Sequence, residues 1–540
     1  MPESYDFVIV GAGSAGCVLA NRLSASGKYS VCVLEAGGTD WRFFVQVPIG
    51  YGKTYYQRAV NWMFHSEEEP GLNGRASYWP RGKVLGGSSS INAMVYIRGH
   101  RQDYDDWAAA GNPGWSYEDV LPYFKKSEGN AQGDERFHGR DGELRIDDQR
   151  QQMHPLIEYF KRAGAALGLD ISEDFNGAQQ SGIGAYQSTV HRGRRMSTSR
   201  AFLRPAMRRP NLSVITRAHS TQVVFEGKRA VGVQYSRRGK RHTVTAKREV
   251  ILSAGAINSP QLLLLSGVGP EQQLQAMGIE PVQHSPAVGQ HLKDHLGVEL
   301  LFKSRIKTLN DRLYPWWGKA LAGLQYFSTG RGPLSLSLNQ GGGFVRSEPS
   351  LKQPNLQLYF SPLSYTRAPV KTRPLMNPDP FSAFMLGISN CRPKSTGSVS
   401  LRSADPLADP VIVANYFSAP EDITELMQGM RYLRELANTA ALREVIVDEF
   451  VPGSEVQSDE QIIKYIRDTA WTVFHPCCSC RMGPDPEHNV VDARLRVHGL
   501  QNIRVADASI FPDIVSGNTN AACIMVGEKA ADMILQDAQR

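Results

Sequence analysis

The sequence has few cysteines, no long apolar run and no serine-nucleophile motif, and each absence argues against a class of protein. Seven cysteines in 540 residues are too few for the disulfide framework of a small secreted protein. No stretch of eighteen apolar residues occurs, so we expect no membrane-spanning helix, while peripheral contact with a membrane stays open. A strand-like run begins at the fifth or sixth residue and leaves no room for a signal peptide, so we expect a cytoplasmic protein. The absence of a GxSxG motif argues against a serine hydrolase.

Metal ligands at characteristic spacings are also sparse. Cys477, Cys478 and Cys480 lie close together near the C-terminus, which by itself would suit a soft metal. A zinc site would usually add a second pair of ligands at CxxC or HxxxH spacing, and no such pair is evident. We therefore expect no metal.

The composition is that of an ordinary globular chain, with 41% hydrophobic and 21% charged residues. A length of 540 residues is too great for one ordinary core and predicts two domains. The net charge of +7 is spread along the chain, apart from clusters at residues 192–195 and 237–241. The second cluster lies in a hairpin-like turn, so a solvated loop is a better interpretation than a nucleic-acid site.

The first 36 residues carry the clearest pattern. An apolar run of strand length at residues 6–10 leads into the glycine-rich segment 11–16 (GAGSAG) and then into helix-like residues 18–23. A second apolar run, 31–34, ends in Glu35 about twenty residues after the glycines. A dinucleotide-binding fold places at this point the carboxylate that accepts hydrogen bonds from the adenosine ribose.

Each glycine of this segment has a separate role in such a fold. Gly11 permits the tight turn, Gly13 lets backbone N–H groups approach a pyrophosphate, and Gly16 lets the helix pack closely on the strand. The helix N-terminus then faces the phosphate charge. A glycine turn alone is common to many α/β proteins, but the strands, helix and acid in register predict a dinucleotide site.

A second segment, residues 81–94 (RGKVLGGSSSINAM), is dense in glycine and serine. Its residues are too small and polar for a core element and suit a backbone that lies against a flat or phosphorylated ligand. The alternative is a flexible linker. The segment leads into the apolar residues 95–99, and a linker would not usually carry Asn92 and Arg98 inside such a frame.

Several motifs together resemble the glucose–methanol–choline (GMC) oxidoreductases, flavoproteins that oxidise alcohols. They are residues 81–92 with 103–107 (DYDDW), 255–260 (GAINSP) with 266–269 (SGVG), 474–476 (FHP) with 480–483 (CRMG), and 507–509 (DAS) with 517–520 (GNTN). The resemblance covers the whole chain. It implies an α/β protein in which a Rossmann-like FAD-binding domain, the GMC fold, is joined to a substrate-binding domain built on an antiparallel sheet flanked by helices.

The resemblance also implies a division of the chain. The FAD-binding domain would comprise residues 1–155, 201–300 and 466–540, and the substrate-binding domain residues 156–200 and 301–465.

FAD would be held by residues from several of these segments. The family's usual residue at the adenine contact is Val, and this chain has Ser220. Some relatives attach FAD covalently through a histidine where this chain has Ile91, so we expect noncovalent FAD. The implied cofactor-binding residues are Gly11, Gly13, Ser14, Ala15, Gly16, Glu35, Ala36, Arg81, Gly82, Leu85, Gly86, Gly87, Ser89, Asn92, Ala93, Met94, Val95, Ser220, Thr221, Ala254, Gly255, Asp507, Ala508, Asn518, Thr519 and Asn520.

Alcohol oxidation removes a hydride from carbon and a proton from oxygen, so the site needs a hydride acceptor and a base. Flavin N5 can accept the hydride. Histidine suits the base because its unperturbed pKa is about 6.5. His475 resembles the family's catalytic histidine, and Asn518 occupies the place of the second catalytic residue, where it would donate a hydrogen bond to the substrate oxygen. Asn518 is also open to interpretation as a turn residue, and His291 and His295 are more typical of buried, hydrogen-bonded histidines than of catalytic ones.

The sequence does not name the alcohol or the electron acceptor. We expect a primary alcohol as substrate and a quinone or other carrier as acceptor, with an alcohol oxidase that uses oxygen, or a hydroxynitrile lyase of the same fold, as alternatives. A choline site would need an aromatic cage and a carboxylate, and the sequence assigns neither. Trp316, Trp317, Tyr326 and Phe327 lie on a segment that the resemblance places near the entrance, and either core packing or substrate contact would explain them.

Overall fold

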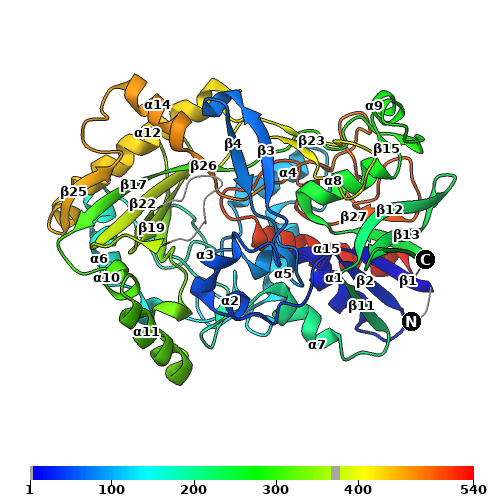
Figure 1. Ribbon diagram of the computed structural model, residues 1–540, viewed down its shortest axis with the longest axis horizontal. Coiled ribbons are helices and arrows are strands. Elements are labelled where there is room, and N and C mark those ends of the chain that lie inside the picture. The colour runs from blue at the N-terminus through cyan, green and yellow to red at the C-terminus, as the bar shows by residue number, and fades with distance from the viewer. Residues whose placement is uncertain (1–3, 367–376, 540) are drawn as a thin grey trace.

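The computed structural model describes residues 4–366 and 377–539 and is built on two β-sheets of seven and eight strands that lie side by side (Figure 1). The N-terminal and C-terminal segments both belong to the side of the seven-stranded sheet.

The seven-stranded sheet has a parallel centre. Its strand order is β11-β2-β1-β14-β13-β12, with β27 also paired to β14. The pairs β11–β2, β2–β1, β1–β14 and β14–β27 are parallel, whereas β12 and β13 form an antiparallel hairpin against β14. The strands are β1 (Ser4–Val10), β2 (Val31–Glu35), β11 (Leu212–Thr216), β12 (His219–Glu226), β13 (Arg229–Arg237), β14 (Lys240–Leu252) and β27 (Ile503–Val505).

The turn between β1 and helix α1 (Ser14–Ser24) depends on two glycines. Gly11 has a φ of +98°, and a Cβ there would lie 2.4 Å from the Ser253 carbonyl oxygen at the end of β14. A Cβ on Gly16 would lie 2.0 Å from the Gly11 carbonyl oxygen. Close packing of α1 on the sheet therefore requires glycine at both positions.

The eight-stranded sheet is antiparallel except for one short pair. Its order is β25-β17-β22-β19-β18-β8-β7, with β26 also paired to β17, and only β7 and β8 are parallel. Helices α6 (Leu156–Ala166), α12 (Pro420–Ala437) and α14 (Asp459–Thr469) pack beside it. The strands are β7 (Ile171–Ser172), β8 (Gly182–Ala185), β17 (Leu296–Ser304), β18 (Gly341–Val345), β19 (Leu356–Ser361), β22 (Ala383–Asn390), β25 (Ile446–Val451) and β26 (Trp471–Thr472). This architecture confirms the expected fold class.

Two features were not expected from the sequence. Strands β17 and β26 pair in the second sheet, although they begin inside ranges expected for the FAD-binding domain. The stretch before residue 80, for which no element was predicted from the sequence, contains helices α2 (Phe43–Gln46) and α3 (Tyr51–Thr54) and a hairpin of β3 (Phe64–Glu69) and β4 (Arg75–Trp79). Consecutive glutamates in β3 hide the alternation that marks a strand, and the third of them, Glu69, is buried with its carboxylate accepting from the Ala414 N–H.

The glycine–serine segment is part of the interior. Its residues 87–90 form a short 3₁₀ helix in which Ser89 and Ser90 are buried. The Ser89 hydroxyl donates to the Gly86 carbonyl at 2.6 Å, and the Ser90 hydroxyl donates to the Leu85 carbonyl at 2.7 Å. The serines are polar yet buried because each hydroxyl bonds the backbone of its own turn.

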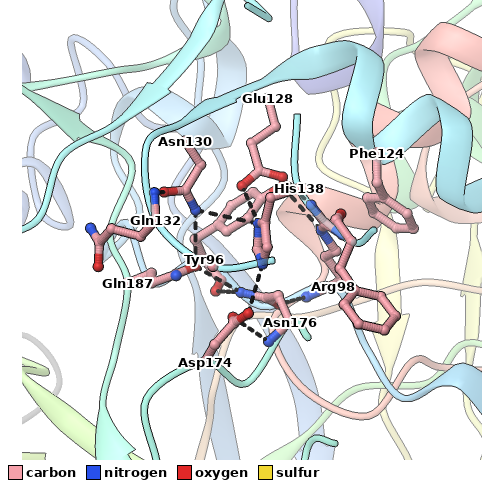
Figure 2. A network of polar contacts seen from close by, with 12 residues as sticks. Tyr96, Arg98, Phe124, Glu128, Asn130, Gln132, His138, Asp174, Asn176 and Gln187 are labelled. Carbon is pink, nitrogen blue, oxygen red and sulfur yellow. Dashed lines mark hydrogen bonds and ion pairs between the residues drawn. The ribbon is translucent and has the colours of Figure 1, made fainter. Parts of the chain in front are cut away.

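A buried network of charged groups connects the segment after this turn to the loop between β7 and β8 of the eight-stranded sheet and to a separate short strand (Figure 2). Arg98 forms an ion pair with Glu128, the first residue of β5 (Glu128–Asn130). His138 lies between two carboxylates, with Nδ1 2.8 Å from Glu128 Oε1 and Nε2 2.7 Å from Asp174 Oδ2. Asp174 lies in the loop between β7 and β8, and Asn176 in the same loop accepts from the Arg98 N–H at 2.9 Å. Two cations therefore match two carboxylates in the interior when His138 is protonated.

The pKa values of this network follow from its pairing. Burial by itself would lower the pKa of His138, but Asp174 and Glu128 raise it above the ordinary value. Burial by itself would raise the pKa of Glu128, but Arg98 and His138 hold it below the ordinary value. The stabilisation supplied by His138 is therefore complete below its unfolded pKa of about 6.5, and it is lost as the pH rises through the higher folded-state pKa.

We expect His138→Gln to destabilise the protein by about 3 kcal/mol at about pH 6, because it removes one partner of a buried ion pair. The difference from wild type should shrink toward about pH 9, where wild-type His138 has lost its charge. Thermal unfolding of both proteins across this pH range measures the effect. His242→Gln, an exposed histidine on β14, is the control and should match wild type throughout. A His138→Gln penalty that stays constant with pH would contradict the assignment of a charged His138.

Candidate active site

A cavity of about 440 Å³ is lined by residues of both sheets and by the segments that follow their strands. It brings together parts of the chain that are hundreds of residues apart. The predicted residues that line it are Gly11, Gly13, Ser14, Ala15, Glu35, Ala36, Arg81, Gly82, Gly87, Asn92, Ala93, Met94, Val95, Ser220, Ala254, Gly255, Asp507, Ala508, Asn518, Thr519 and Asn520, together with His475.

Five predicted residues, Gly16, Leu85, Gly86, Ser89 and Thr221, do not line the cavity. Gly16 packs against the backbone of Gly11, and the Ser89 hydroxyl bonds Gly86. Thr221 follows Ser220 on strand β12, where neighbouring side chains point to opposite faces. These five residues lie outside the cavity lining. Their direct contact with a cofactor stays a prediction.

Three helices begin at one end of the cavity. They are α1, α8 (Gly255–Leu265) and α15 (Asn520–Asp537). The first residues of each, or those just before them, line the cavity, and the Ser14 hydroxyl of α1 donates to Asn520 Oδ1 of α15 at 2.7 Å. Because a helix N-terminus carries partial positive charge and unpaired N–H groups, three together form a site for a pyrophosphate.

Asp507 positions two of these elements. Its Oδ2 accepts from the Gly255 N–H at 2.8 Å and from the Ser259 hydroxyl at 2.6 Å, both in α8. Its Oδ1 accepts from the Ser509 N–H at 2.8 Å. The carboxylate therefore holds the start of α8 beside the turn at residues 508–510.

Glu35 ends β2 and lines the same part of the cavity. Its carboxylate accepts from the N–H groups of Ala12 at 2.9 Å and Gly37 at 2.7 Å. Burial raises its pKa to about 7, although these two hydrogen bonds oppose the shift. The carboxylate thus stabilises the turn after β1, and its remaining lone pairs can accept hydrogen bonds from a ligand in the cavity.

The other end of the cavity holds His475 and Asn518, which the sequence predicted as a pair. Asn518 Nδ2 lies 3.0 Å from His475 Nε2. The Asn518 amide is oriented by Gln357, whose Nε2 donates to Asn518 Oδ1 at 3.2 Å. Gly517 allows this approach, because a Cβ there would lie 2.7 Å from Ile97.

His295 determines which nitrogen of His475 is free to accept a proton. His295 Nε2 lies 2.8 Å from the carbonyl oxygen of Cys391, which can only accept, so this nitrogen carries the hydrogen. His295 Nδ1 then has a lone pair and faces His475 Nδ1 at 2.9 Å, so His475 Nδ1 must donate. His475 Nε2 therefore presents its lone pair beside Asn518, as a general base requires.

Both imidazoles are neutral in this arrangement. Burial lowers the pKa of His295 to about 4. Burial, His295 and the guanidinium of Arg81 together hold the pKa of His475 well below its ordinary value. His475 is therefore an unprotonated base across the physiological pH range.

The backbone of His475 is held by a second group that the sequence analysis did not identify. The carboxylate of Asp294 accepts from the His475 N–H at 2.7 Å and from the Tyr416 hydroxyl at 2.6 Å. It also accepts from the Thr472 hydroxyl. Phe474 has a φ of +67°, a left-handed conformation that is unfavourable for a large side chain and that the surrounding contacts maintain.

The sequence contained one signal for these supports. Asp294 and His295 are adjacent and directly precede strand β17, but their partners come from elsewhere in the chain. His295 is buried with both ring nitrogens bonded, as expected, but one partner is His475 itself. His291 is partly exposed, which differs from the expectation of burial.

The fold and the cavity define a dinucleotide-dependent oxidoreductase with a neutral imidazole at one end of the cavity. The family described as GMC oxidoreductase matches residues 5–297 with its N-terminal part and residues 393–527 with its C-terminal part. The chain belongs to this family, so it is an FAD enzyme that oxidises the CH–OH group of alcohols.

Individual relatives resemble the chain over almost its full length. Alcohol dehydrogenase [acceptor] of Pseudomonas putida is 44% identical, with 98% of this chain and 96% of the relative covered. Oxygen-dependent choline dehydrogenase of Sinorhizobium medicae is also 44% identical, with 98% and 95% covered. The crystal structure of pyridoxine 4-oxidase from Mesorbium loti has a TM-score of 0.88 at 30% identity, with 99% of both chains covered.

Features of the cavity itself also fit FAD, independently of the comparison with relatives. Ser220 Oγ, at the expected adenine end, is buried and has no hydrogen-bond partner among the described residues. A Cβ on Gly13 would meet no protein atom closer than 3.7 Å, so that side of the turn is open toward a ligand. An unpartnered hydroxyl, three helix N-termini and the Glu35 carboxylate match an adenosine and a pyrophosphate.

We expect the rate of flavin reduction by an alcohol to be nearly constant from about pH 6 to 9, because only neutral His475 accepts the proton and its pKa is well below that range. Anaerobic stopped-flow absorbance measures this rate apart from reoxidation. His295→Gln should keep the profile, since its amide can accept from His475 Nδ1 and donate to Cys391, whereas His295→Leu should lose about tenfold. A reduction rate that falls with an apparent pKa near 6.5 would show that His475 is not held neutral.

Proposed function

We propose that the protein oxidises uncharged primary alcohols to aldehydes, with noncovalently bound FAD and His475 as general base. The observation that carries this proposal is the lone pair of His475 Nε2, which lies beside Asn518. The lone pair is on Nε2 because His295 Nε2–H donates to the Cys391 carbonyl, and His475 Nδ1–H then donates to His295 Nδ1.

His475 and Asn518 have different roles toward the substrate hydroxyl group. FAD supplies the hydride acceptor when it is bound. His475 Nε2 takes the hydroxyl proton, and its Nδ1–H stays hydrogen-bonded to His295. Without substrate, Asn518 Nδ2 donates to the single lone pair of His475 Nε2. The substrate hydroxyl would replace this donor on His475, and Asn518 Nδ2 would then donate to the substrate oxygen as negative charge grows there.

The lining of this end of the cavity favours a substrate without charge. It includes Tyr55, Leu338, Tyr359 and Met385. Among the described residues that line the cavity, the carboxylates are those of Glu35 and Asp507, both at the cofactor end. Two charged side chains lie near His475: Arg81, a cation that lines the cavity, and Asp294, whose carboxylate bonds the His475 backbone and does not line the cavity. A quaternary ammonium group would meet repulsion from Arg81 and no facing carboxylate, so choline is disfavoured.

The noncovalent binding of FAD and the type of electron acceptor are each supported by a separate observation. Ile91 lines the cavity and has no nucleophile, which supports noncovalent FAD. The name of the Pseudomonas putida relative specifies an acceptor and supports a quinone or other carrier, whereas pyridoxine 4-oxidase represents the use of oxygen in the same fold.

Anaerobic mixing with a panel of alcohols tests the proposed reaction and substrate class together. We expect 1-alkanols and benzylic alcohols to bleach the flavin, and choline to do so at least about tenfold more slowly because of Arg81. Subsequent addition of oxygen or of a soluble quinone shows which acceptor restores the oxidised spectrum faster. A flavin that stays oxidised with every alcohol in the panel would contradict the proposed substrate class, and choline as the best substrate would overturn the uncharged-alcohol proposal.

We expect His475→Ala to retain FAD and slow flavin reduction by roughly 10²–10⁴-fold, the usual scale of general base catalysis. Asn518→Ala should cost less, about 10²–10³-fold, because it removes one hydrogen bond to the developing charge. Stopped-flow reduction measures both, with FAD content checked by absorbance. His488→Ala is the matched control, since this histidine is exposed and pairs only with Asp485 within the described chain. A wild-type reduction rate in His475→Ala would assign the proton to another group.

A further inference from the structure

One side of the molecule carries a group of large apolar side chains in contact with solvent. Helix α11 (Trp316–Thr329) forms the lower left edge of the molecule in Figure 1. On this helix Trp316 is 80% exposed and Phe327 73% exposed. The outer face of α11 and the neighbouring segment together form what we term the apolar face, composed of Trp41, Phe43, Phe44, Trp316, Trp317, Leu321, Leu324 and Phe327.

The apolar face is continuous across two elements. The ring of Phe43 in α2 stacks on that of Phe327 in α11, with centroids 5.8 Å apart. The expected roles for the α11 aromatics were core packing or substrate contact. Only Tyr326 is buried, where its hydroxyl donates to the Gly193 carbonyl at 3.0 Å, and none of the four lines the cavity. Clustered, exposed apolar side chains of this size mark an interaction surface.

The chain segments around the apolar face are rich in basic residues, and the acidic residues Asp40, Asp311 and Glu348 adjoin their ends. Residues 41–63 have three Lys and Arg residues, 188–210 have seven, and 312–347 have four, and none of these stretches has an Asp or Glu. Arg194 and Arg200 lie near Tyr326, and Arg204 stacks on Trp41 with its guanidinium 3.9 Å from the ring centroid. Arg204 is itself paired with Asp40, so the other cations supply most of the positive field.

The charge and the residue types of the apolar face together indicate which kind of partner fits it. A helix that presents Trp, Phe and Leu on one face beside Lys and Arg is typical of helices that lie in the interface of an anionic bilayer. A second copy of the chain would have to place the same basic segments against each other, because a two-fold interface joins identical patches. We propose that the apolar face docks this protein on an anionic lipid surface, with α11 lying in the interfacial layer.

The membrane contact would be with one leaflet. No helix in the described part of the chain is both long and apolar enough to cross a bilayer. The inner side of α11 packs Ala322 into a cluster with Tyr51, Met94 and Leu338, all three of which line the active-site cavity. The inner side of α11 therefore belongs to the same apolar cluster as part of the cavity lining, which would bring a lipid-soluble alcohol or quinone to the side of the protein that holds this part of the site.

The FAD-loaded protein can be tested directly with vesicles of phosphatidylcholine, with and without phosphatidylglycerol. We expect wild type to co-sediment with the anionic vesicles, and brominated acyl chains to quench its tryptophan fluorescence. The triple variant Trp316→Ser, Leu324→Ser and Phe327→Ser should lose roughly a hundredfold in partitioning, because each substitution removes a large apolar side chain from the interface. Arg194→Gln with Lys319→Gln should weaken binding only where anionic lipid is present.

A matched control uses exposed apolar residues elsewhere. Leu407→Ser with Val447→Ser changes side chains that are 61% and 52% exposed and lie outside the apolar face, and it should bind vesicles as wild type does. All variants should oxidise a water-soluble alcohol at the wild-type rate with a soluble acceptor. This assay tests the catalytic proposal independently of vesicle binding.

Two outcomes would overturn the proposal. The first is vesicle binding that the triple variant leaves unchanged. The second is a wild-type dimer, measured by light scattering without lipid, that becomes a monomer in the triple variant while neither protein binds vesicles. In that case a second copy of the chain covers the apolar face.

Discussion

The hydrogen bond between His295 Nδ1 and His475 Nδ1 is the constraint on which the chemistry of the site depends. It exists because β26 pairs with β17, which places the residues before β17 beside those after β26. Cys391 follows β22, the neighbour of β17 on its other side, and accepts the second His295 hydrogen bond. The eight-stranded sheet therefore sets the tautomer of the base, while the seven-stranded sheet and its helices form the cofactor end. The active site is assembled only where the two halves meet.

Electrostatics divides the cavity into two regions. At one end three helix N-termini lie together, and their partial positive charge suits a pyrophosphate. At the other end burial, His295 and the nearby Arg81 hold the pKa of His475 well below its ordinary value. In the proposed function the same cation disfavours a positively charged substrate. Arg81 would then affect both the pKa of His475 and the class of alcohol.

The network of Arg98, Glu128, His138 and Asp174 has a supporting role behind this site (Figure 2). It fixes the backbone at Arg98, one residue after Ile97, whose side chain limits the space beside Gly517 and thereby beside Asn518. Helix α11 contributes Ala322 to an apolar cluster that includes three lining residues, and it turns Trp316, Trp317 and Phe327 outward. Charge pairing and apolar packing thus each support residues close to the cavity.

The sequence alone was enough to predict the dinucleotide-binding turn and the family, and it singled out His475 and Asn518, whose catalytic roles stay a prediction. This was possible because a turn such as residues 11–16 is formed by consecutive residues whose conformational needs are local, as the φ of Gly11 shows. The hairpin β3–β4 escaped prediction, because its alternation was masked by glutamates whose burial depends on distant partners such as Ala414. Only the tertiary structure decided that His295 sets the tautomer of His475, 180 residues away, and that Trp316 and Phe327 face outward. Such features arise from contacts between segments far apart in the chain, and a local residue pattern carries no information about which segments will meet.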